Sequence, residues 1–217
     1  LALSCGQQPA EPACGKSVKV LAIGNSFSQD AVEQYLWELF DAAGVEAVVG
    51  NLYIGGCSLE RHFNNSVTGK ADYAYRKVVA GGKTEYRNFT LQAGIEDEEW
   101  DYISVQQVSG KSGLPETYEP YMTELLEYVH ATASGSPKMM FHQTWAYAAD
   151  SDHGDFPDYG CDPMAMYRAI VETSSEAARL HGIDIIIPSG TTIQNARTSY
   201  LGDSFNRDGY HLELNYG

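Results

Sequence analysis

Val18-Lys-Val-Leu-Ala-Ile-Gly-Asn-Ser-Phe-Ser28 is the stretch from which the fold of this chain can be predicted. Its first part, Val18–Ile23, is an apolar run of strand length that is rich in β-branched residues. Gly24 and Asn25 then interrupt the run, because both residues tolerate the dihedral angles of a turn. The stretch therefore predicts a buried strand that ends in a tight turn, with Ser26 at the tip of that turn.

A helix is predicted just beyond the turn, over Ala31–Ala43, because apolar residues recur there at helical spacing. A strand, a turn and a helix in this order would hold the Ser26 hydroxyl above the end of a sheet. The N–H groups at the helix start would stabilise negative charge there. The alternative is that Ser26 or Ser28 only caps the helix, and the local sequence leaves both interpretations open.

Strand-like and helical runs alternate along the rest of the chain. The predicted strands are Ala47–Tyr53, Tyr102–Gln106, Lys138–His142 and Ile183–Pro188, and the predicted helices are Tyr118–Ala131 and Met164–Leu180. Because a helix between two strands requires parallel pairing, we predict an α/β domain: a doubly wound, flavodoxin-like, five-stranded parallel sheet with helices on both faces. Ligands bind outside the carboxyl ends of the strands in such sheets, which is where Ser26 lies.

An inserted β-hairpin interrupts this alternation. Tyr73–Val79 and Thr84–Leu91 have the pattern of two strands joined by a short glycine-containing turn. The hairpin either covers a cleft with its aromatic side chains or forms a plain sheet edge, and the sequence favours neither.

Composition and charge limit the possible partners. The 217 residues suffice for one domain with a sizeable core. The formal net charge is −15, from 29 acidic and 14 basic residues, which argues against a nucleic-acid partner because phosphates would be repelled. The same charge disfavours direct docking on anionic lipid. Fifteen Tyr and three Trp suit a sugar-binding surface, although aromatic residues also fill cores.

Residues 1–16 are excluded from the predicted domain, which spans residues 17–217. Leu1-Ala-Leu-Ser-Cys5 resembles the end of a bacterial lipoprotein signal. We therefore expect an exported protein, in the periplasm or at the cell surface, whose only membrane attachment is a lipid on Cys5. Ordinary leader residues are the alternative. No cysteine spacing indicates a metal site, and Cys57 and Cys161 are expected to be buried free thiols.

Chemically useful residues follow the second and third predicted strands. Gly55 and Gly56 allow a close approach of the backbone to a ligand, so that a free N–H could point at an oxyanion. Gln106 and Gln107 offer side-chain amides at the same edge of the sheet. A glutamine that is simply hydrogen-bonded to a loop backbone is the alternative reading of either residue.

Further candidates follow the fourth strand. Gln107, Trp145 and Tyr147 are expected to line a substrate pocket, although core packing explains the aromatic residues equally well. His142 could serve as a base, but a structural or substrate-lining role is preferred for it, because His211 is the better candidate base. The acidic loop that follows, residues 150–158, resembles a calcium loop, but Gly154 comes too early for that motif. We expect this loop, which includes His153, to be a solvated acidic loop without a metal.

Asp208 and His211 stand three residues apart near the C-terminus. This spacing lets the carboxylate accept from one imidazole nitrogen, which fixes the tautomer of the ring. The other ring nitrogen could then remove the proton of Ser26. Asp-x-x-His alone is a common coincidence, so the proposal depends on the other motifs.

The order of these motifs resembles that of the SGNH/GDSL hydrolase superfamily, over about residues 18–212. Within the superfamily the chain looks most like a bacterial group, often lipoproteins of poorly described function, whose first block reads GNSFS. The resemblance implies a three-layer fold in which Ser26 is the nucleophile, Asp208 and His211 complete the triad, and Gly56 is the oxyanion glycine of the second block.

Three departures from the superfamily pattern stand out. The first block usually reads GDSxS, and we expect Asn25 to be tolerated in place of the aspartate. The third block usually supplies an asparagine from GxND, whereas this chain has QQVS, so Gln106 is the first candidate for the third oxyanion donor and Gln107 the second. The chain also ends six residues after His211, where such folds usually continue into a final packing helix, so we expect a truncation there.

The expected function is therefore a serine esterase without metal or cofactor. Its expected substrate is a small-molecule or glycan ester, with O-acetylated carbohydrate favoured by the aromatic content and the predicted lipoprotein setting. A lipase or thioesterase for longer acyl chains and a non-catalytic glycan-binding lipoprotein are the alternatives.

Overall fold

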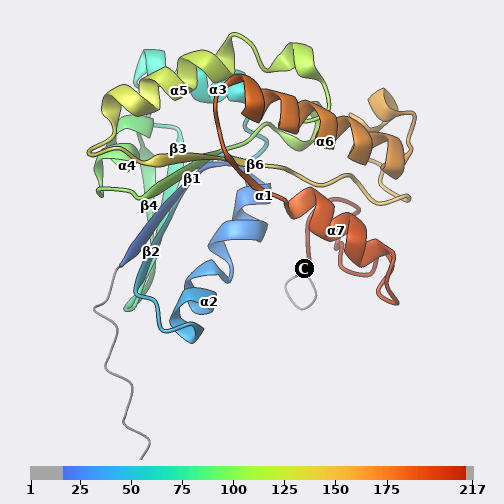
Figure 1. The fold of residues 1–217 in the computed structure, drawn as a ribbon, viewed down its shortest axis with the longest axis horizontal. Helices are drawn as coiled ribbons and strands as arrows, with labels where there is room; N and C mark the ends of the chain where they lie inside the picture. The colour runs from blue at the N-terminus through green and yellow to red at the C-terminus, as the bar shows by residue number, and fades with distance from the viewer. Residues whose placement is uncertain (1–16, 214–217) are drawn as a thin grey trace, which may run out of the picture.

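A seven-stranded sheet forms the centre of the molecule (Figure 1). The structure, a computed structural model, describes residues 17–213. The strand order is β4-β3-β2-β1-β5-β6-β7. The strands are β1 Val18–Gly24, β2 Ala47–Tyr53, β3 Tyr73–Val79, β4 Gly82–Phe89, β5 Tyr102–Val105, β6 Lys138–His142 and β7 Ile185–Ile187.

The predicted five-stranded parallel sheet is confirmed, in the order β2-β1-β5-β6-β7. The hairpin β3–β4 extends it, because β3 pairs antiparallel with β2. Tyr73 and Tyr75 of β3 are buried in the core. The hairpin is thus a sheet edge whose inner aromatic side chains belong to the core.

Helices cover both faces of the sheet, as predicted. The helices are α1 Ser26–Ser28, α2 Leu36–Ala42, α3 Leu59–Thr68, α4 Leu91–Glu96, α5 Tyr121–Thr132, α6 Pro163–Leu180 and α7 Ser189–Arg197. Figure 1 shows α3, α4, α5 and α6 on one face and α1, α2 and α7 on the other. The sheet and its two helical layers make the three-layer arrangement that the resemblance implied.

The first helical segment differs from the prediction. Instead of one helix over Ala31–Ala43, helical structure begins at Ser26, passes through a π-helical turn over Gln29–Glu33, and resumes as α2. The break lies at Tyr35, whose φ of −135° is not helical. The helices α3, α4 and α7 were not predicted, because they are short or largely polar.

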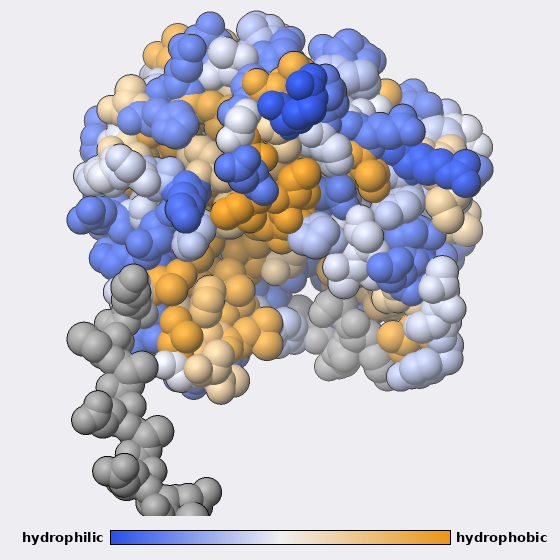
Figure 2. Space-filling view, in the orientation of Figure 1, coloured by the Kyte–Doolittle hydropathy of each residue, from blue (hydrophilic) through white to orange (hydrophobic). Residues whose placement is uncertain are grey.

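Strand β1 is buried on both faces, which explains its uninterrupted apolar sequence. Leu21 and Ile23 pack with the helices of one face, and Ala22 packs with Val32 and Val49 on the other. Apolar side chains also reach the surface around α2 (Figure 2), where Leu39 is exposed. Within residues 17–213, no helix is both long and apolar enough to cross a membrane.

The two described cysteines are free, as predicted, but only one is buried. Cys57 lies in the core, whereas Cys161 is exposed, and this corrects the expectation for Cys161. Cys161 follows the short helical turn Phe156–Tyr159 on the surface, where its φ is +54°. The expected tether of residues 1–16, with its anchor at Cys5, lies outside the described residues.

Candidate active site

Ser26 is the first residue of α1 and directly follows the buried turn at the end of β1. Asn25, not a serine, caps the helix, because its Oδ1 accepts the N–H of Phe27 at 3.0 Å. Ser28 is buried and its hydroxyl is bonded to Asn51. The Ser26 hydroxyl has no hydrogen-bond partner within residues 17–213, so this side chain is available for another role.

Asp208 and His211 form the hydrogen-bonded pair that their spacing predicts. His211 Nδ1 lies 2.6 Å from Asp208 Oδ2, and the backbone N–H of His211 donates to Asp208 Oδ1 at 2.7 Å. A carboxylate only accepts, so Nδ1 carries the proton and Nε2 is left as the basic nitrogen. Partial burial raises the pKa of Asp208, but the hydrogen bonds from His211 outweigh burial and hold it below its ordinary value. The carboxylate therefore stays charged at neutral pH.

Ser26 and His211 line the same pocket, which has a volume of about 270 Å³ and is called the Ser26 pocket below. The His211 ring also meets the ring of Phe27, the residue after Ser26, with 6.1 Å between centroids. The structure thus brings the early serine and the late histidine to one rim of the sheet.

Two contacts hold the late loop on the early helical segment, and a third holds it on the segment that follows β6. Asp30 Oδ2 accepts the N–H of Leu212 at 3.0 Å, across 182 positions of sequence. The Arg207 guanidinium lies 3.6 Å from the other oxygen of Asp30. Trp145 Nε1 donates to the carbonyl of Tyr210 at 2.6 Å. These contacts anchor the segment that carries Asp208 and His211.

Two backbone N–H groups are free to bind an oxyanion in the Ser26 pocket. Those of Ser26 and Gly56 find no acceptor in the described part of the chain, and both residues line the pocket. At the first residue of a helix an unpaired N–H is expected. Gly56 has a φ of +60°, a left-handed conformation that favours glycine. The predicted assignments of Ser26 and Gly56 are compatible with this geometry.

Gln106, the expected third oxyanion donor, does not reach the pocket. It is buried, its amide donates to Asn25 Oδ1 at 2.8 Å, and its Oε1 accepts from His142 Nδ1 at 2.7 Å. Gly24 makes room for it, because a Cβ there would lie 2.8 Å from Gln106 Oε1. Its polar groups are thus used in supporting the turn before Ser26, and the oxyanion assignment is corrected.

Gln107 and His142 also lie behind the pocket wall, contrary to the expected substrate-binding role. Gln107 is buried, accepts the N–H of Leu59 at 3.0 Å and donates to the carbonyl of Thr117 at 3.0 Å. His142 is buried between Gln106 and Ser189, and this burial lowers the pKa of His142 to about 4. Both side chains have their polar atoms paired within the protein, so we assign them structural roles.

Trp145 and Tyr147 are likewise fully buried and do not line the pocket. The Trp145 ring stacks on Phe27 at a centroid distance of 4.0 Å, directly beneath the turn that carries Ser26. The Tyr147 hydroxyl lies 2.9 Å from Ser109 Oγ. Core packing, the alternative left open by the sequence, is therefore the observed role of both rings.

The residues that do line the pocket include several that the sequence did not single out. Tyr53, Ser109, His153 and Tyr210 are among them. Tyr53 ends β2 just before the paired glycines, and Tyr210 directly precedes His211. Their positions next to these motifs could therefore have identified both as pocket residues. His153 belongs to the acidic loop that was expected to be solvated, and nothing in its sequence context distinguished it.

Cys57 is excluded as a rival nucleophile although it follows Gly56. Its side chain is fully buried, and burial raises the pKa of its thiol to about 12, so it stays protonated. No group of three or more His, Cys, Asp or Glu side chains within residues 17–213 is arranged to hold a metal ion.

Comparisons with known proteins give a family and a fold. Residues 19–217 match the family described as "Domain of unknown function (DUF4886)". A crystal structure of a DUF4886 family protein from Bacteroides uniformis is 54% identical, with 92% of this chain and 77% of that chain covered and a TM-score of 0.89. No curated protein sequence matches the chain.

More distant structures share the fold. A member of the lipolytic G-D-S-L family from Veillonella parvula is 14% identical, with 91% of both chains covered and a TM-score of 0.57. Axe2, an acetylxylan esterase from Geobacillus stearothermophilus, is 11% identical, with 93% of this chain and 89% of that chain covered and a TM-score of 0.57. The predicted fold class is thereby confirmed.

Proposed function

We propose that this chain, which belongs to the DUF4886 family, is a serine esterase that acts through Ser26, His211 and Asp208. One observation carries the proposal. A serine hydroxyl without a partner among the described residues lines the same pocket as a histidine whose far nitrogen is bonded to a carboxylate. This combination activates serine in unrelated hydrolases.

The proposed reaction proceeds through an acyl-enzyme. His211 Nε2 removes the proton of Ser26 while Oγ attacks the ester carbonyl, and the N–H groups of Ser26 and Gly56 stabilise the resulting oxyanion. The C–O bond to the alcohol then breaks, and the His211 imidazolium gives its proton to the departing alkoxide. Water, deprotonated by His211, attacks the acyl-enzyme carbonyl, the bond between the acyl carbon and Ser26 Oγ breaks to release the acid, and the His211 imidazolium returns its proton to Ser26 Oγ. Asp208 stabilises the imidazolium in both halves of the reaction.

A short acyl group on a carbohydrate is the substrate class that we favour. The Ser26 pocket is small, and Val108 is the only aliphatic residue among those that line it in the described chain. Tyr53 and Tyr210 offer aromatic surface for a sugar ring. Arg76 packs over the ring of Tyr53 at 4.1 Å, which fixes one of these walls. A pocket of about 270 Å³ offers little space for a long acyl chain.

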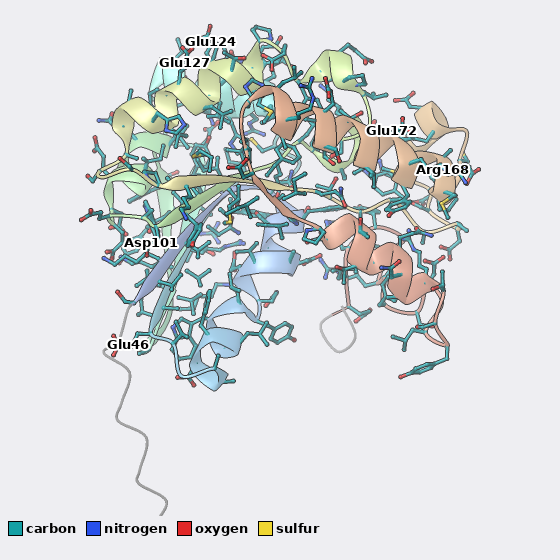
Figure 3. The ribbon with its side chains drawn as sticks, in the orientation of Figure 1. Glu46, Asp101, Glu124, Glu127, Arg168 and Glu172 are labelled. Atoms are coloured by element: carbon teal, nitrogen blue, oxygen red, sulfur yellow. The ribbon has the colours of Figure 1, made fainter. Side chains whose placement is uncertain are left out.

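The charge of the protein supports a neutral or cationic substrate. Acidic side chains such as Glu124 and Glu127 project from the outer face of α5 into solvent (Figure 3). Together with the net charge of −15, they disfavour polyanionic esters and nucleic acids.

An exported, lipid-anchored setting remains part of the proposal. It depends on Cys5, outside the described residues, and would put the enzyme near extracellular or periplasmic glycans. An alkyne fatty acid fed to the producing cells should label the wild-type protein but not Cys5→Ala. Equal labelling of both proteins would contradict the anchor.

Labelling with a fluorophosphonate tests the nucleophile. We expect the probe to label wild type and Ser28→Ala but not Ser26→Ala, and the Ser26 variant to lose at least about 10⁴-fold in kcat/KM. Ser28 is a matched control because it is the second serine of the same motif and is buried. Labelling of Ser26→Ala at the wild-type rate would refute the assignment.

A series of p-nitrophenyl esters separates the alternatives. A short-chain esterase has its highest kcat/KM with acetate, whereas a lipase or thioesterase gains as the chain lengthens. A glycan-binding protein without activity would hydrolyse none of the esters and would bind sugar equally well as Ser26→Ala.

A further inference from the structure

Ser109 lines the Ser26 pocket, whereas Gln106, the expected oxyanion donor, does not. It follows β5 and begins a short helical turn, Ser109–Lys111. The side chain is 5% exposed, and it lines the pocket together with Ser26, Gly56 and His211. Its hydroxyl therefore shares this pocket with both free N–H groups of the proposed oxyanion site.

The hydrogen bond between Ser109 and Tyr147 has a direction that can be worked out. The two hydroxyl oxygens lie 2.9 Å apart, and either could donate. Tyr147 is fully buried, and Ser109 is the only partner of its hydroxyl within residues 17–213. If Ser109 donated, the Tyr147 proton would be buried without an acceptor, which is unfavourable.

Tyr147 is therefore the donor and Ser109 Oγ the acceptor. The proton of the Ser109 hydroxyl is then left over, because this hydroxyl has no other partner in the described chain. The open side of Ser109 is the pocket. The buried tyrosine thus turns the serine O–H bond toward the place where substrate would bind.

We propose that Ser109 is a catalytic residue whose O–H donates the third hydrogen bond to the oxyanion, and that Tyr147 is its positioning residue. The inference rests on the proposed esterase function and deepens it. No proton is transferred to or from Ser109, since its hydrogen bond only strengthens as the carbonyl oxygen becomes negative. A donor that is oriented before the reaction is more effective than one that must reorient during it.

The experiment compares Ser109→Ala with Ser112→Ala. Removal of an oxyanion donor is expected to lower kcat for p-nitrophenyl acetate by about 10²–10³-fold, with KM changed by less than about 3-fold. Ser112 is a matched control in the same loop, because it is buried, donates to the carbonyl of Val108 at 3.0 Å and does not line the pocket. Its variant should keep kcat within about 3-fold of wild type.

Phenylboronic acid gives a second readout that a structural role would not move. The boronate forms a tetrahedral adduct with the Ser26 hydroxyl that resembles the intermediate. Its inhibition constant should rise in Ser109→Ala by the same order as kcat falls, and should be unchanged in Ser112→Ala.

Tyr147→Phe tests the orienting role and serves if Ser109→Ala does not fold. Alone it should lower kcat on the order of 10-fold, because Ser109 is no longer oriented. Added to Ser109→Ala it should lower kcat by less than about 2-fold, because there is no hydroxyl left to orient. Equal losses in both backgrounds would overturn the positioning role.

The outcomes separate this inference from the proposed function. If wild type is labelled at Ser26 and hydrolyses esters but Ser109→Ala keeps kcat and boronate affinity within about 3-fold of wild type, the Ser109 assignment is wrong and the esterase stands. If wild type neither reacts with the fluorophosphonate nor hydrolyses any ester, the esterase proposal fails and the Ser109 assignment fails with it.

Discussion

Asn25→Asp is the substitution that most directly tests how the turn before Ser26 is built. Asn25 is buried, and its Oδ1 accepts from Phe27 N–H at 3.0 Å and from Gln106 at 2.8 Å. Its Nδ2 donates to the carbonyl of Cys57 at 3.0 Å. An aspartate, the residue usual in the superfamily block, retains both acceptor contacts but has no donor for Cys57 when ionised. Asn25 thus has a specific role at this position, because its Nδ2 supplies a donor that an ionised aspartate lacks.

The cost of this change follows from the lost donor. Leaving a buried carbonyl without its partner costs about 1–3 kcal/mol, and placing a carboxylate oxygen next to it adds the cost of burying an unpaired charge. We expect the free energy of unfolding to fall by about 3–4 kcal/mol at pH 7.5. For a chain of this length that corresponds to a midpoint lower by about 6–16 °C.

The deficit should depend on pH in one direction. The introduced carboxyl is buried against a carbonyl, so its pKa in the folded state lies above its pKa in the unfolded state. Its protonated form can donate to Cys57, which restores the missing hydrogen bond. The stability difference from wild type is therefore smallest below the unfolded-state pKa, and it grows as the pH rises through the raised folded-state pKa.

Urea unfolding of wild type and variant measures this difference. The pH series runs from 4.5 to 7.5, about the range over which such a carboxyl titrates. Asn64→Asp is the control, because Asn64 is exposed on α3 and its variant should stay within about 0.5 kcal/mol of wild type. A deficit of Asn25→Asp below about 1 kcal/mol at pH 7.5, or one that does not shrink on acidification, would refute the role assigned to Asn25.

Three further variants test the surroundings of the site. Asp208→Asn should lower kcat about 10³–10⁴-fold in an ester assay, because His211 loses its charged partner. Its melting midpoint should move little, because the Oδ1 of an asparagine can still accept the backbone N–H of His211. His142→Gln should be less stable than wild type near neutral pH, and this deficit should shrink as the pH falls from about 6.5 toward 4. Because the pKa of His142 is lowered in the folded state, only the unfolded wild-type chain binds a proton at this residue in that range, which destabilises wild type alone. A deficit that stays constant in urea unfolding at a series of pH values would contradict this reasoning. Trp145→Phe should lower the free energy of unfolding by about 2–4 kcal/mol and kcat/KM by at least about 10-fold, because it removes the hydrogen bond to Tyr210 that anchors the loop before His211. Calorimetry measures the first change and the ester assay the second, and unchanged activity would contradict the anchoring role.

The core of the fold was predictable because β1 and its parallel neighbours are buried on both faces. Burial on both faces requires long apolar runs, and such runs are visible in a sequence without any tertiary information. The helix α3 was missed for the opposite reason. It buries His62 and Asn65 in addition to Leu59, so its inner face does not read as apolar.

The candidate site was predictable where its chemistry depends on local spacing. Asp208 and His211 are three residues apart and meet within one turn, and Ser26 is fixed by the strand and turn before it. The roles of Gln106 and Ser109 were not predictable. Both follow β5, and which of them faces the pocket depends on Asn25 and His142, which belong to other strand ends and bind the Gln106 amide.

The contact between Asp30 and Leu212 has a consequence for biosynthesis. The two partners are 182 residues apart, so at translation rates of about 5–20 residues per second the ribosome needs roughly 10–40 s to produce the second after the first. Throughout that interval the nascent polypeptide displays its serine but no base to activate it. The proposed esterase activity would therefore require that the chain has been made at least as far as Leu212.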